Sequence, residues 1–301
     1  MKLTILGCHS ATPRTNTKPT SQVLEIRNHL FLIDCGEGTQ VELRRNKIKF
    51  ARIKHIFISH LHGDHYFGLV GLISTFRLLN READLHVYGP KGLKEIITLQ
   101  MKLADSWTNY QLFFHELNSD TSELIFEDEK VEVYTIPLDH RIYTNGFLFR
   151  EKEGERKLKM NEVLNNNIDV SYYRKLKLGF DVINNDGELI KNEIVTKPGV
   201  KPKSYAFCSD TAYNEKIVPL IKNIDVLYHE ATFLDKHKKL TMTTKHSTAN
   251  EAAQIAKIAQ VGQLILGHYS TRYDDLEMFK IEAKGIFENV ELAEDGKTFI
   301  F

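Results

Sequence analysis

The sequence predicts an α/β fold, and three observations lead to this class. Short apolar runs recur along the chain, and several of them end at a polar side chain. Between these runs lie stretches in which apolar residues recur three and four positions apart, as on the buried face of a helix. Finally, 301 residues with 42% hydrophobic content can bury a large core, as one domain or as two closely merged halves.

The first half of the chain contains the most specific signal. Residues 1–7 are typical of an opening strand, and the apolar run at residues 56–58 leads directly into the motif His60-Leu61-His62-Gly63-Asp64-His65. Residues 92–117 are expected to form a helix, because aliphatic side chains recur on one side of it.

Four further strands are predicted after residue 130, and each leads into a polar residue. They are residues 131–136 before His140, residues 205–208 before Asp210, residues 226–228 before His229 and Glu230, and residues 264–267 before His268. Open α/β sheets commonly place their sites at the carboxyl ends of strands. We therefore expect these strand ends to converge with the end of the 56–58 run.

A helix is predicted to begin at Thr248, because Thr248 and Glu251 have the spacing of a capping box. His246 lies just ahead of this helix, so the helix start fixes its position. The last residues predict a hairpin with strands at 289–292 and 298–301 around the turn Asp295-Gly296.

The six-residue motif has the spacing of a metal-binding loop. His60 and His62 point the same way in an extended segment, so both can bind one ion. Gly63 permits a sharp turn that brings Asp64 and His65 to a neighbouring position. Imidazole and carboxylate are the ligands that Zn²⁺ accepts when no thiolate is offered, and burying this cluster without an ion would leave several polar groups unpaired. A lone histidine would be an ordinary loop side chain, but this loop predicts two adjacent metals.

Charge and cysteine usage exclude several classes of protein. The 40 basic and 40 acidic residues cancel, so no global positive field holds nucleic acid. Cys8, Cys35 and Cys208 are widely spaced in apolar contexts, which predicts buried thiols and no disulfide framework. No apolar run is long enough for a membrane span, and the first residues do not resemble a signal peptide. We expect a cytoplasmic protein without a membrane partner.

Residues 151–203 interrupt the alternation of strands and helices. This segment is polar and asparagine-rich, and it reads as an insertion that projects from the core. Its basic residues cluster beside aromatic ones, at 156–159, at 174–177 and at Lys201 with Lys203, a mixture that suits contact with a phosphate backbone. The alternative is a solvated surface arm without a partner.

The motif, followed by His140, Asp210 and His268, resembles the order of ligands in the metallo-β-lactamase superfamily. Three further stretches are similar to its tRNA 3′-processing branch, the ribonuclease Z family. They are residues 31–40 (FLIDCGEGTQ), residues 228–233 (YHEATF) and residues 245–248 (KHST). The metal motif alone is shared with thioester hydrolases and lactamases, whereas the last two stretches are more selective. The resemblance runs from Leu3 to beyond Arg272.

This resemblance implies a fold and a ligand set. The fold would be a single αββα sandwich domain over residues 1–301 that carries the arm at residues 151–203. Two Zn²⁺ ions would bind in each subunit, and the seven implied ligands divide between them. His60, His62 and His140 would hold one ion, Asp64, His65 and His268 would hold the second, and Asp210 would bridge both. Four positive charges against two carboxylates would leave the pocket at about +2, which attracts a phosphodiester.

The resemblance also implies catalytic roles. Asp64 would take a proton from the attacking water, and His246 would protonate the leaving 3′-oxygen. Glu230 would accept the other N–H of His246 and fix its tautomer and charge. The alternative is that His246 only caps the following helix. Cleavage of precursor tRNA would leave a 3′-hydroxyl on the tRNA and a 5′-phosphate on the trailer.

Several residues are expected to have supporting or structural roles. Asp34 is expected to orient a liganding histidine or the loop after it. Six other histidines lack converging partners in the sequence, and we interpret them as structural. They are His9, His29, His55, His86, His115 and His237.

The arm occupies the place where the ribonuclease Z family carries a flexible arm that grips the tRNA elbow, usually across a homodimer. Lys175-Leu176-Lys177-Leu178-Gly179 is similar to part of that arm's motif, although Ser171-Tyr172 stands where a Gly-Pro pair is expected. The loop at residues 13–19 also departs from the family pattern, which leaves open whether tRNA with a CCA end is rejected.

Two rival functions remain at this point. A small-molecule phosphodiesterase or thioester hydrolase of the same fold would share all seven metal ligands but dispense with the basic arm. A non-catalytic RNA-binding protein would keep the metals for structure, although it would not need both Asp64 and His246.

Overall fold

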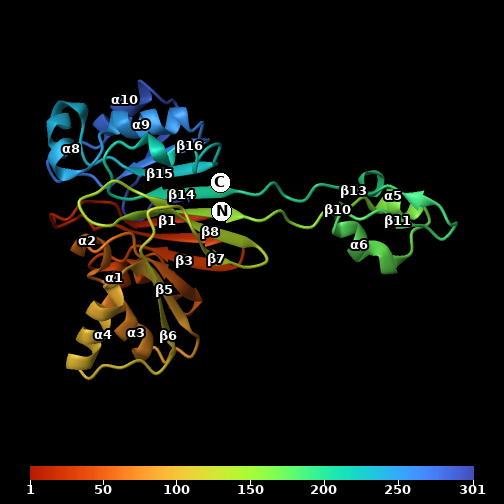
Figure 1. The fold of residues 1–301 in the computed structure, drawn as a ribbon, viewed down its shortest axis with the longest axis horizontal. Coiled ribbons are helices and arrows are strands. Elements are labelled where there is room, and N and C mark those ends of the chain that lie inside the picture. Colours follow the sequence, from red (N-terminus) through yellow and green to blue (C-terminus); the bar gives the residue numbers. More distant parts are fainter. The chain divides into compact units, whose positions relative to one another are not determined.

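The computed structural model describes residues 1–301 and divides them into two compact units. The first unit comprises Met1–Glu127, Val131–Arg150 and Lys203–Phe301, and the second comprises Asp128–Lys130 and Glu151–Pro202 (Figure 1). Each unit has a hydrophobic core of its own. None of the helices combines the length and apolarity that a membrane span requires.

The first unit contains two seven-stranded sheets. The order of the first sheet is β18 (Thr298–Ile300), β1 (Lys2–Gly7), β2 (Ser21–Ile26), β3 (His29–Ile33), β4 (Ile53–Phe57), β5 (Leu85–Pro90) and β6 (Leu112–Leu117). The order of the second is β17 (Val290–Leu292), β16 (Gln263–Gly267), β15 (Val226–Glu230), β14 (Ser204–Cys208), β9 (Asn145–Glu151), β8 (Val131–Pro137) and β7 (Leu124–Glu127). Strands β3 to β6 run parallel, and so do β14 to β17. Their carboxyl ends are therefore available to build a site.

Helices cover the outer faces of both sheets. The helices on the first sheet's side are α1 (Thr39–Arg45), α3 (Leu69–Leu78) and α4 (Leu93–Leu103), and those on the second sheet's side are α8 (Lys238–Thr244), α9 (Ala249–Ile258) and α10 (Glu277–Lys284) (Figure 1). The short helix α2 (Gly63–Tyr66) follows β4, and single 3₁₀ turns occur at Phe50–Arg52, Glu215–Ile217 and Asp235–His237. The result is an αββα sandwich, as the resemblance implied.

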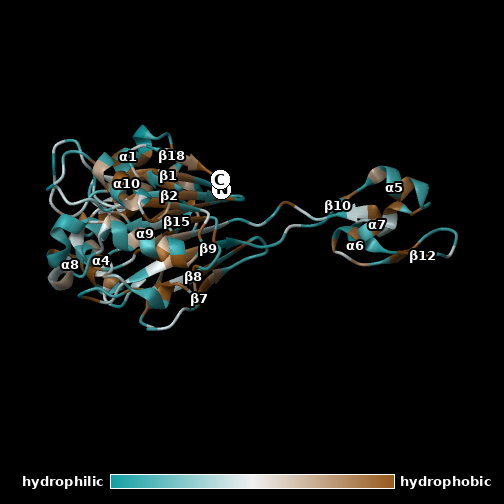
Figure 2. Ribbon diagram, turned by 90° about the horizontal axis from the view of Figure 1, so that it is seen from above, coloured by the Kyte–Doolittle hydropathy of each residue, from teal (hydrophilic) through white to brown (hydrophobic).

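Aromatic side chains fill the space between the sheets. Phe31 and Phe57 of the first sheet contact Phe149 and Phe147 of the second at ring-centroid distances of 5.4 and 5.3 Å. All four side chains are fully buried, and Figure 2 shows hydrophobic colour concentrated on the strands. Burial of large apolar surface is the main stabilising contribution, and it makes the strand ends a rigid support for the loops that follow them.

Two of the expected elements differ from the structure. The expected helix at residues 92–117 ends at Leu103, and Leu112–Leu117 forms β6, which pairs with β5. A turn at Asp105, with φ of 46°, separates the two. The expected hairpin is also wrong: β17 pairs with β16 and β18 pairs with β1, so the turn at Gly296 connects the two sheets.

The second unit is a small mixed fold. Its elements are β10 (Lys157–Leu158), α5 (Met160–Asn165), α6 (Tyr173–Lys177), β11 (Val182–Ile183), β12 (Leu189–Ile190), α7 (Asn192–Val195) and β13 (Thr196–Lys197), with a 3₁₀ turn at Val170–Tyr172. A core around Val163, Leu176 and Val195 holds them together. Lys203, which the sequence placed at the end of the arm, belongs to the first unit, where its Nζ lies 3.1 Å from Asp225 Oδ1.

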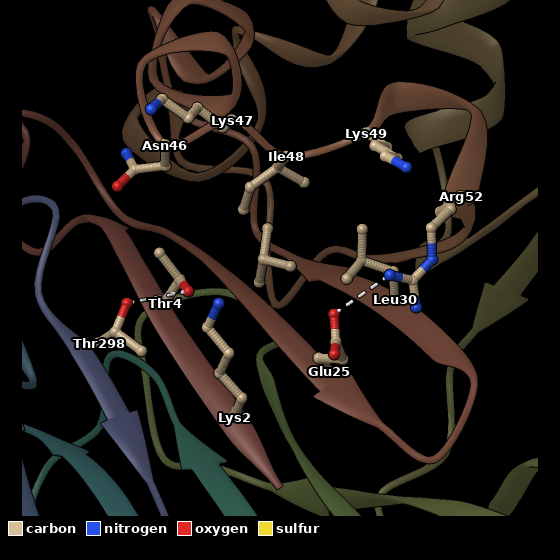
Figure 3. A pocket seen from close by; sticks show the side chains of 11 residues that line it. Lys2, Thr4, Glu25, Leu30, Asn46, Lys47, Ile48, Lys49, Arg52 and Thr298 are labelled. Carbon is tan, nitrogen blue, oxygen red and sulfur yellow. Dashed lines mark hydrogen bonds and ion pairs between the residues drawn. The ribbon is translucent and has the colours of Figure 1, made fainter.

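A basic pocket lies on the outer side of the first sheet, where strands β1 to β3 meet the segment after α1 (Figure 3). Lys2, Lys47, Lys49 and Arg52 line it, and Arg52 pairs with Glu25 at 3.3 Å. None of the nine candidate site residues lines this pocket, so the candidate site lies elsewhere.

Candidate metal centre

All seven predicted ligands lie together at the carboxyl ends of strands from both sheets. The loop after β4 supplies four of them, and α2 begins within it at Gly63. His140, Asp210 and His268 follow β8, β14 and β16. Five of the seven side chains are almost wholly enclosed, with exposed fractions of 4% or less for His60, His65, His140, Asp210 and His268.

The first ligand group consists of His60, His62, His140 and Asp210. His62 Nδ1 lies 3.0 Å from His60 Nε2 and 3.2 Å from His140 Nε2. Asp210 Oδ2 lies 3.5 Å from His60 Nε2 and 3.8 Å from His140 Nε2. Ligands about 2.0–2.2 Å from a tetrahedral zinc are separated from one another by roughly 3.3–3.5 Å. The four atoms are thus spaced to share one ion.

The second ligand group consists of Asp64, His65 and His268. Asp64 Oδ2 lies 3.3 Å from His65 Nε2 and 3.4 Å from His268 Nε2. Asp210 faces this group with its other oxygen, because Oδ1 lies 3.5 Å from His65 Nε2 and 3.2 Å from His268 Nε2. One carboxylate therefore presents one oxygen to each group, which is the arrangement of a bridging ligand.

The donor atoms meet a direct test of whether a cation fits. His65 Nε2 and Asp210 Oδ1 are buried and have no hydrogen-bond partner in the protein. Leaving such atoms unpaired costs on the order of 1–3 kcal/mol each, and more for a charged group. A divalent cation between them would satisfy both, so the residues fit a metal.

Electrostatics also favour a cation at this position. Burial lowers the pKa of His60 to about 3, and it lowers the pKa values of His62 and His140, so these imidazoles are neutral and offer lone pairs. Burial alone would raise the pKa of Asp210, but the surrounding histidines hold it well below its ordinary value. Three neutral imidazoles beside an ionised carboxylate are a ligand set for a metal. The nearby carboxylates raise the pKa of His65 against the effect of burial, so a metal there would displace the proton of its Nε2.

Asp34 contacts the second ligand group through the His65 ring nitrogen that faces away from the other ligands. Its Oδ2 accepts a 2.7 Å hydrogen bond from His65 Nδ1–H, and both Asp34 oxygens accept from Ser59. The carboxylate is fully buried and directs His65 Nε2 toward the other ligands. The structure therefore places Asp34 against a candidate ligand, in the position expected of an orienting residue.

Glu230 and His246 form a hydrogen-bonded pair beside the ligands. His246 Nδ1–H donates to Glu230 Oε1 at 2.9 Å, and this nitrogen lies 4.0 Å from Asp210 Oδ2. Burial disfavours the charged imidazolium of His246, but Glu230 and Asp210 outweigh burial and raise the pKa of His246 to about 9. His246 therefore keeps its proton at neutral pH.

Thr232 and Ser59 belong to the site, and the sequence interpretation overlooked their roles. Thr232 Oγ1 accepts from His268 Nδ1–H at 2.8 Å and donates to Glu230 Oε2 at 2.8 Å. Ser59 Oγ lies 3.0 Å from His60 Nδ1. Ser59 directly precedes the six-residue motif and Thr232 lies within the 228–233 stretch, but a hydroxyl gives no chemical signal until its partners are known. The backbone carbonyl of Lys245 accepts from His140 Nδ1–H at 2.8 Å. A backbone carbonyl is present in every residue, so the sequence contains no signal for this contact.

The six histidines interpreted as structural lie outside this centre. His29, His55, His86 and His115 form a row across neighbouring strands of the first sheet, and His237 Nδ1 contacts the Tyr273 hydroxyl at 2.6 Å. His9 differs from the expectation that it lacks converging partners, because it lies beside Cys8 and Asp295.

An αββα sandwich with a buried histidine and aspartate cluster at its strand ends defines a protein of the metallo-β-lactamase fold. Two solved structures agree. The structure matches the short form of human tRNase Z (ELAC1), with a TM-score of 0.73 and 27% identity over 100% of this chain and 99% of that one. It also matches the Bacillus subtilis metallo-β-lactamase fold protein YhfI, with a TM-score of 0.69 and 18% identity over 99% of this chain and 98% of that one.

Sequence comparison identifies the branch of this fold. Ribonuclease Z of Bacteroides thetaiotaomicron is 47% identical over 295 residues, which cover 98% of this chain and 93% of the relative. The chain belongs to the ribonuclease Z family. A family model described as Anti-Pycsar protein Apyc1 also matches residues 1–157. That part contains the motif and His140 but ends before Asp210, Glu230, His246 and His268. The family model therefore does not cover the Glu230–His246 pair.

Proposed function

We propose that this protein is a zinc-dependent endoribonuclease that removes the 3′ trailer from precursor tRNA. Membership of the ribonuclease Z family supports the reaction class. The observation that carries the proposal is the Glu230–His246 pair beside the two ligand groups, because a metal site that cuts an ester with a poor leaving group needs a proton donor.

His60, His62, His140 and Asp210 would hold one Zn²⁺, and Asp64, His65 and His268 would hold a second that shares Asp210. When bound, the ions would neutralise the phosphodiester and lower the pKa of water at the site. This assignment of metals and roles rests on the spacing of the ligand atoms and on the resemblance of the motifs.

The chain's own groups complete the proposed reaction. The neighbouring His65 and His268 hold the pKa of Asp64 far below its ordinary range against the effect of burial, so Asp64 is ionised and can accept a proton from the attacking water. Water attacks phosphorus, and the bond to the 3′-oxygen of the tRNA breaks. His246 gives its Nε2 proton to that oxygen. Glu230 stabilises the imidazolium before this transfer and keeps its hydrogen bond to Nδ1–H afterwards. The products are a tRNA 3′-hydroxyl and a trailer 5′-phosphate.

We further propose that the second unit is the tRNA-binding arm. Lys157, Arg174, Lys175 and Lys177 are exposed on it, and Phe180 is 59% exposed beside them. Cations next to an aromatic face suit an RNA backbone and its bases. A homodimer in the cytoplasm, with each arm serving the partner's site, is the arrangement that the family resemblance favours.

Incubation of the protein with a 3′-extended precursor tRNA, with and without a chelator, tests the proposed reaction. We expect one cut next to the discriminator base, which leaves a 3′-hydroxyl and a 5′-phosphate, and loss of cutting with the chelator. A cut that persists after removal of metal, or a product with a 2′,3′-cyclic phosphate, would contradict the proposal.

A further inference from the structure

A second cluster of ligand-type side chains lies outside the catalytic centre. It consists of Cys8 and His9, which follow β1, and Asp295, which lies in the turn between β17 and β18. The cluster thus joins residues from the two ends of the chain. Cys8 is fully buried, whereas the side chains of His9 and Asp295 are 14% and 20% exposed.

The three donor atoms form a nearly equilateral triangle. Cys8 Sγ lies 3.4 Å from Asp295 Oδ1 and 3.8 Å from His9 Nδ1, and His9 Nδ1 lies 3.6 Å from Asp295 Oδ1. A tetrahedral ion with a sulfur ligand at about 2.3 Å and nitrogen and oxygen ligands at about 2.0–2.2 Å separates these atoms by roughly 3.4–3.6 Å. The observed triangle agrees with one face of that tetrahedron.

Hydrogen bonds account for the two edges of the triangle at Cys8 but not for the edge between His9 and Asp295. The Cys8 thiol can donate to Asp295 Oδ1, and the backbone N–H of Lys18 donates to Asp295 Oδ2 at 2.9 Å. The 3.6 Å between His9 Nδ1 and Asp295 Oδ1 is too long for a hydrogen bond, although an imidazole N–H beside a carboxylate normally closes to about 2.8 Å. His9 Nδ1 therefore contacts the Cys8 sulfur at 3.8 Å and lies beside the carboxylate without a hydrogen bond to it.

The charges in the cluster would balance a divalent ion. A thiolate and a carboxylate together carry two negative charges, and His9 is a neutral ligand when its Nδ1 lone pair is free. The complex with a divalent cation is then neutral, which removes most of the cost of burying charge. Burial and the neighbouring Asp295 raise the pKa of the Cys8 thiol, so the cation has to displace its proton. Glu294 and Lys297 also act on Cys8, with charges of opposite sign.

We propose that Cys8, His9 and Asp295 bind one divalent transition metal of the zinc class, at a site separate from the catalytic centre. Binding releases the proton of the Cys8 thiol to solvent, as thiolate coordination requires. Because the side chains of His9 and Asp295 are partly exposed, water would supply the fourth ligand. The ligand groups of the catalytic centre consist of histidines and aspartates, so this site alone includes a sulfur ligand.

The metal would stabilise the backbone next to the catalytic centre. The carbonyl of Cys8 accepts hydrogen bonds from the backbone N–H groups of His268 and Tyr269, at 2.7 and 3.2 Å. A metal on Cys8 and Asp295 would fix this carbonyl relative to the last turn of the chain. The site is therefore expected to stabilise the loop that presents His268.

Replacement of the bound metals by Co²⁺ tests the proposal. A cobalt–thiolate bond gives a near-ultraviolet charge-transfer band, and the catalytic centre cannot produce it because its ligands are histidines and aspartates. We expect the band in the wild-type protein, its loss in Cys8→Ser, and one metal ion fewer per chain in that variant. Cys35→Ser is the matched control, because Cys35 is equally buried and Thr39 can hydrogen-bond a hydroxyl there.

Two milder variants keep the test decisive if Cys8→Ser does not fold. His9→Gln and Asp295→Asn each remove one ligand from a partly exposed position and keep the thiol. Each is expected to shift or weaken the band and to lower cobalt affinity at this site. Absence of the band in the wild-type protein, its persistence in Cys8→Ser, or an unchanged band in both milder variants would overturn the proposal.

Discussion

At the scale of single residues, the candidate metal centre is organised by what holds the far side of each ligand. Asp34 holds His65, Thr232 holds His268, and the Lys245 carbonyl holds His140. In each case the ring nitrogen away from the cluster donates its proton, which leaves Nε2 free to bind an ion. The direction of each imidazole is therefore set before any metal arrives.

Asp64→Ala is expected to abolish cleavage of precursor tRNA and to leave tRNA binding within a few-fold of wild type. The substitution removes a proton acceptor and one oxygen that faces His65 and His268. Cleavage assays and filter binding on the same precursor measure the two effects, with the exposed Asp120→Ala as the control. Retention of cleavage would contradict the proposed role of Asp64.

Glu230→Gln is expected to move the alkaline limb of the pH–rate profile to lower pH. His246 must be protonated to act as an acid, and Glu230 is the largest influence that raises its pKa against burial. Without that charge the pKa falls from about 9, so the proton is lost at lower pH. Profiles of kcat/KM for wild type, Glu230→Gln and the exposed Glu82→Gln make the comparison, and an unshifted limb would argue against the pair.

Asp34→Asn is expected to weaken metal binding by about 10–100-fold without unfolding the protein. The amide keeps the shape of the side chain and tolerates its left-handed backbone, at φ of 54°, but removes the charge that holds His65. Metal content after dialysis against graded chelator measures the loss. Asp105→Asn is a matched control, because Asp105 also has positive φ and lies outside the site.

Much of the site could be predicted from residue types alone. The four ligands of the loop are close in sequence, so their spacing showed that they could share metals. Asp210, His140 and His268 could be placed because each follows a strand. Thr232 and Ser59 could not, because a hydroxyl is recognisable as a support only when both of its hydrogen-bond partners are located.

At the scale of elements, helix α9 fixes one side of the centre. Thr248 Oγ1 accepts from the Glu251 backbone N–H at 3.2 Å, and Glu251 Oε2 accepts from the Thr248 N–H at 3.0 Å. The capping box predicted from the sequence is confirmed. His246 lies two residues before this cap, so a firm helix start limits the movement of His246 and its pairing with Glu230.

Thr248→Ala is expected to reduce the free energy of unfolding by about 0.5–2 kcal/mol, as for other N-cap replacements. The change leaves the Glu251 N–H without its side-chain partner and removes a 2.7 Å hydrogen bond to Asp235. Urea unfolding should show a lower midpoint with an unchanged slope. The exposed Thr243→Ala serves as the control, and equal midpoints for the two variants would show that the cap contributes nothing.

Element boundaries were less predictable than the cap. The periodicity that predicted a helix over residues 92–117 continues past Leu103, but the segment at Leu112–Leu117 gains more from pairing with β5. The apolar residues around Asp295-Gly296 have the local pattern of a hairpin. Their partners, β16 and β1, are distant in sequence, and local patterns do not contain that information.

At the scale of the whole molecule, two units with separate cores divide the proposed tasks. All nine candidate catalytic and metal residues lie in the first unit, and the proposed RNA-binding surface lies in the second. The chain leaves the first unit after Arg150 and returns before Ser204, and these two residues are paired neighbours on β9 and β14. The order of strands in the two sheets could not be read from the sequence, whereas the polar composition of residues 151–203 was visible.

Deletion of residues 151–202 is expected to separate the two proposed tasks. A short turn can join Arg150 to Lys203, because the neighbouring strands already lie side by side. We expect the shortened protein to retain its metals and hydrolysis of bis(p-nitrophenyl) phosphate while losing at least tenfold in kcat/KM on structured precursor tRNA. Unchanged cleavage of precursor tRNA would remove the support for the arm and favour a small-molecule hydrolase.

The division of ligands between the two sheets has a consequence for biosynthesis. A ribosome completes the loop with His60, His62, Asp64 and His65 early, but the second ligand group still lacks His268 until nearly nine-tenths of the chain has been made. A growing chain can therefore complete the first ligand group before the second. Loading of both groups, and with it the ability to cut RNA, would be delayed until synthesis is nearly complete.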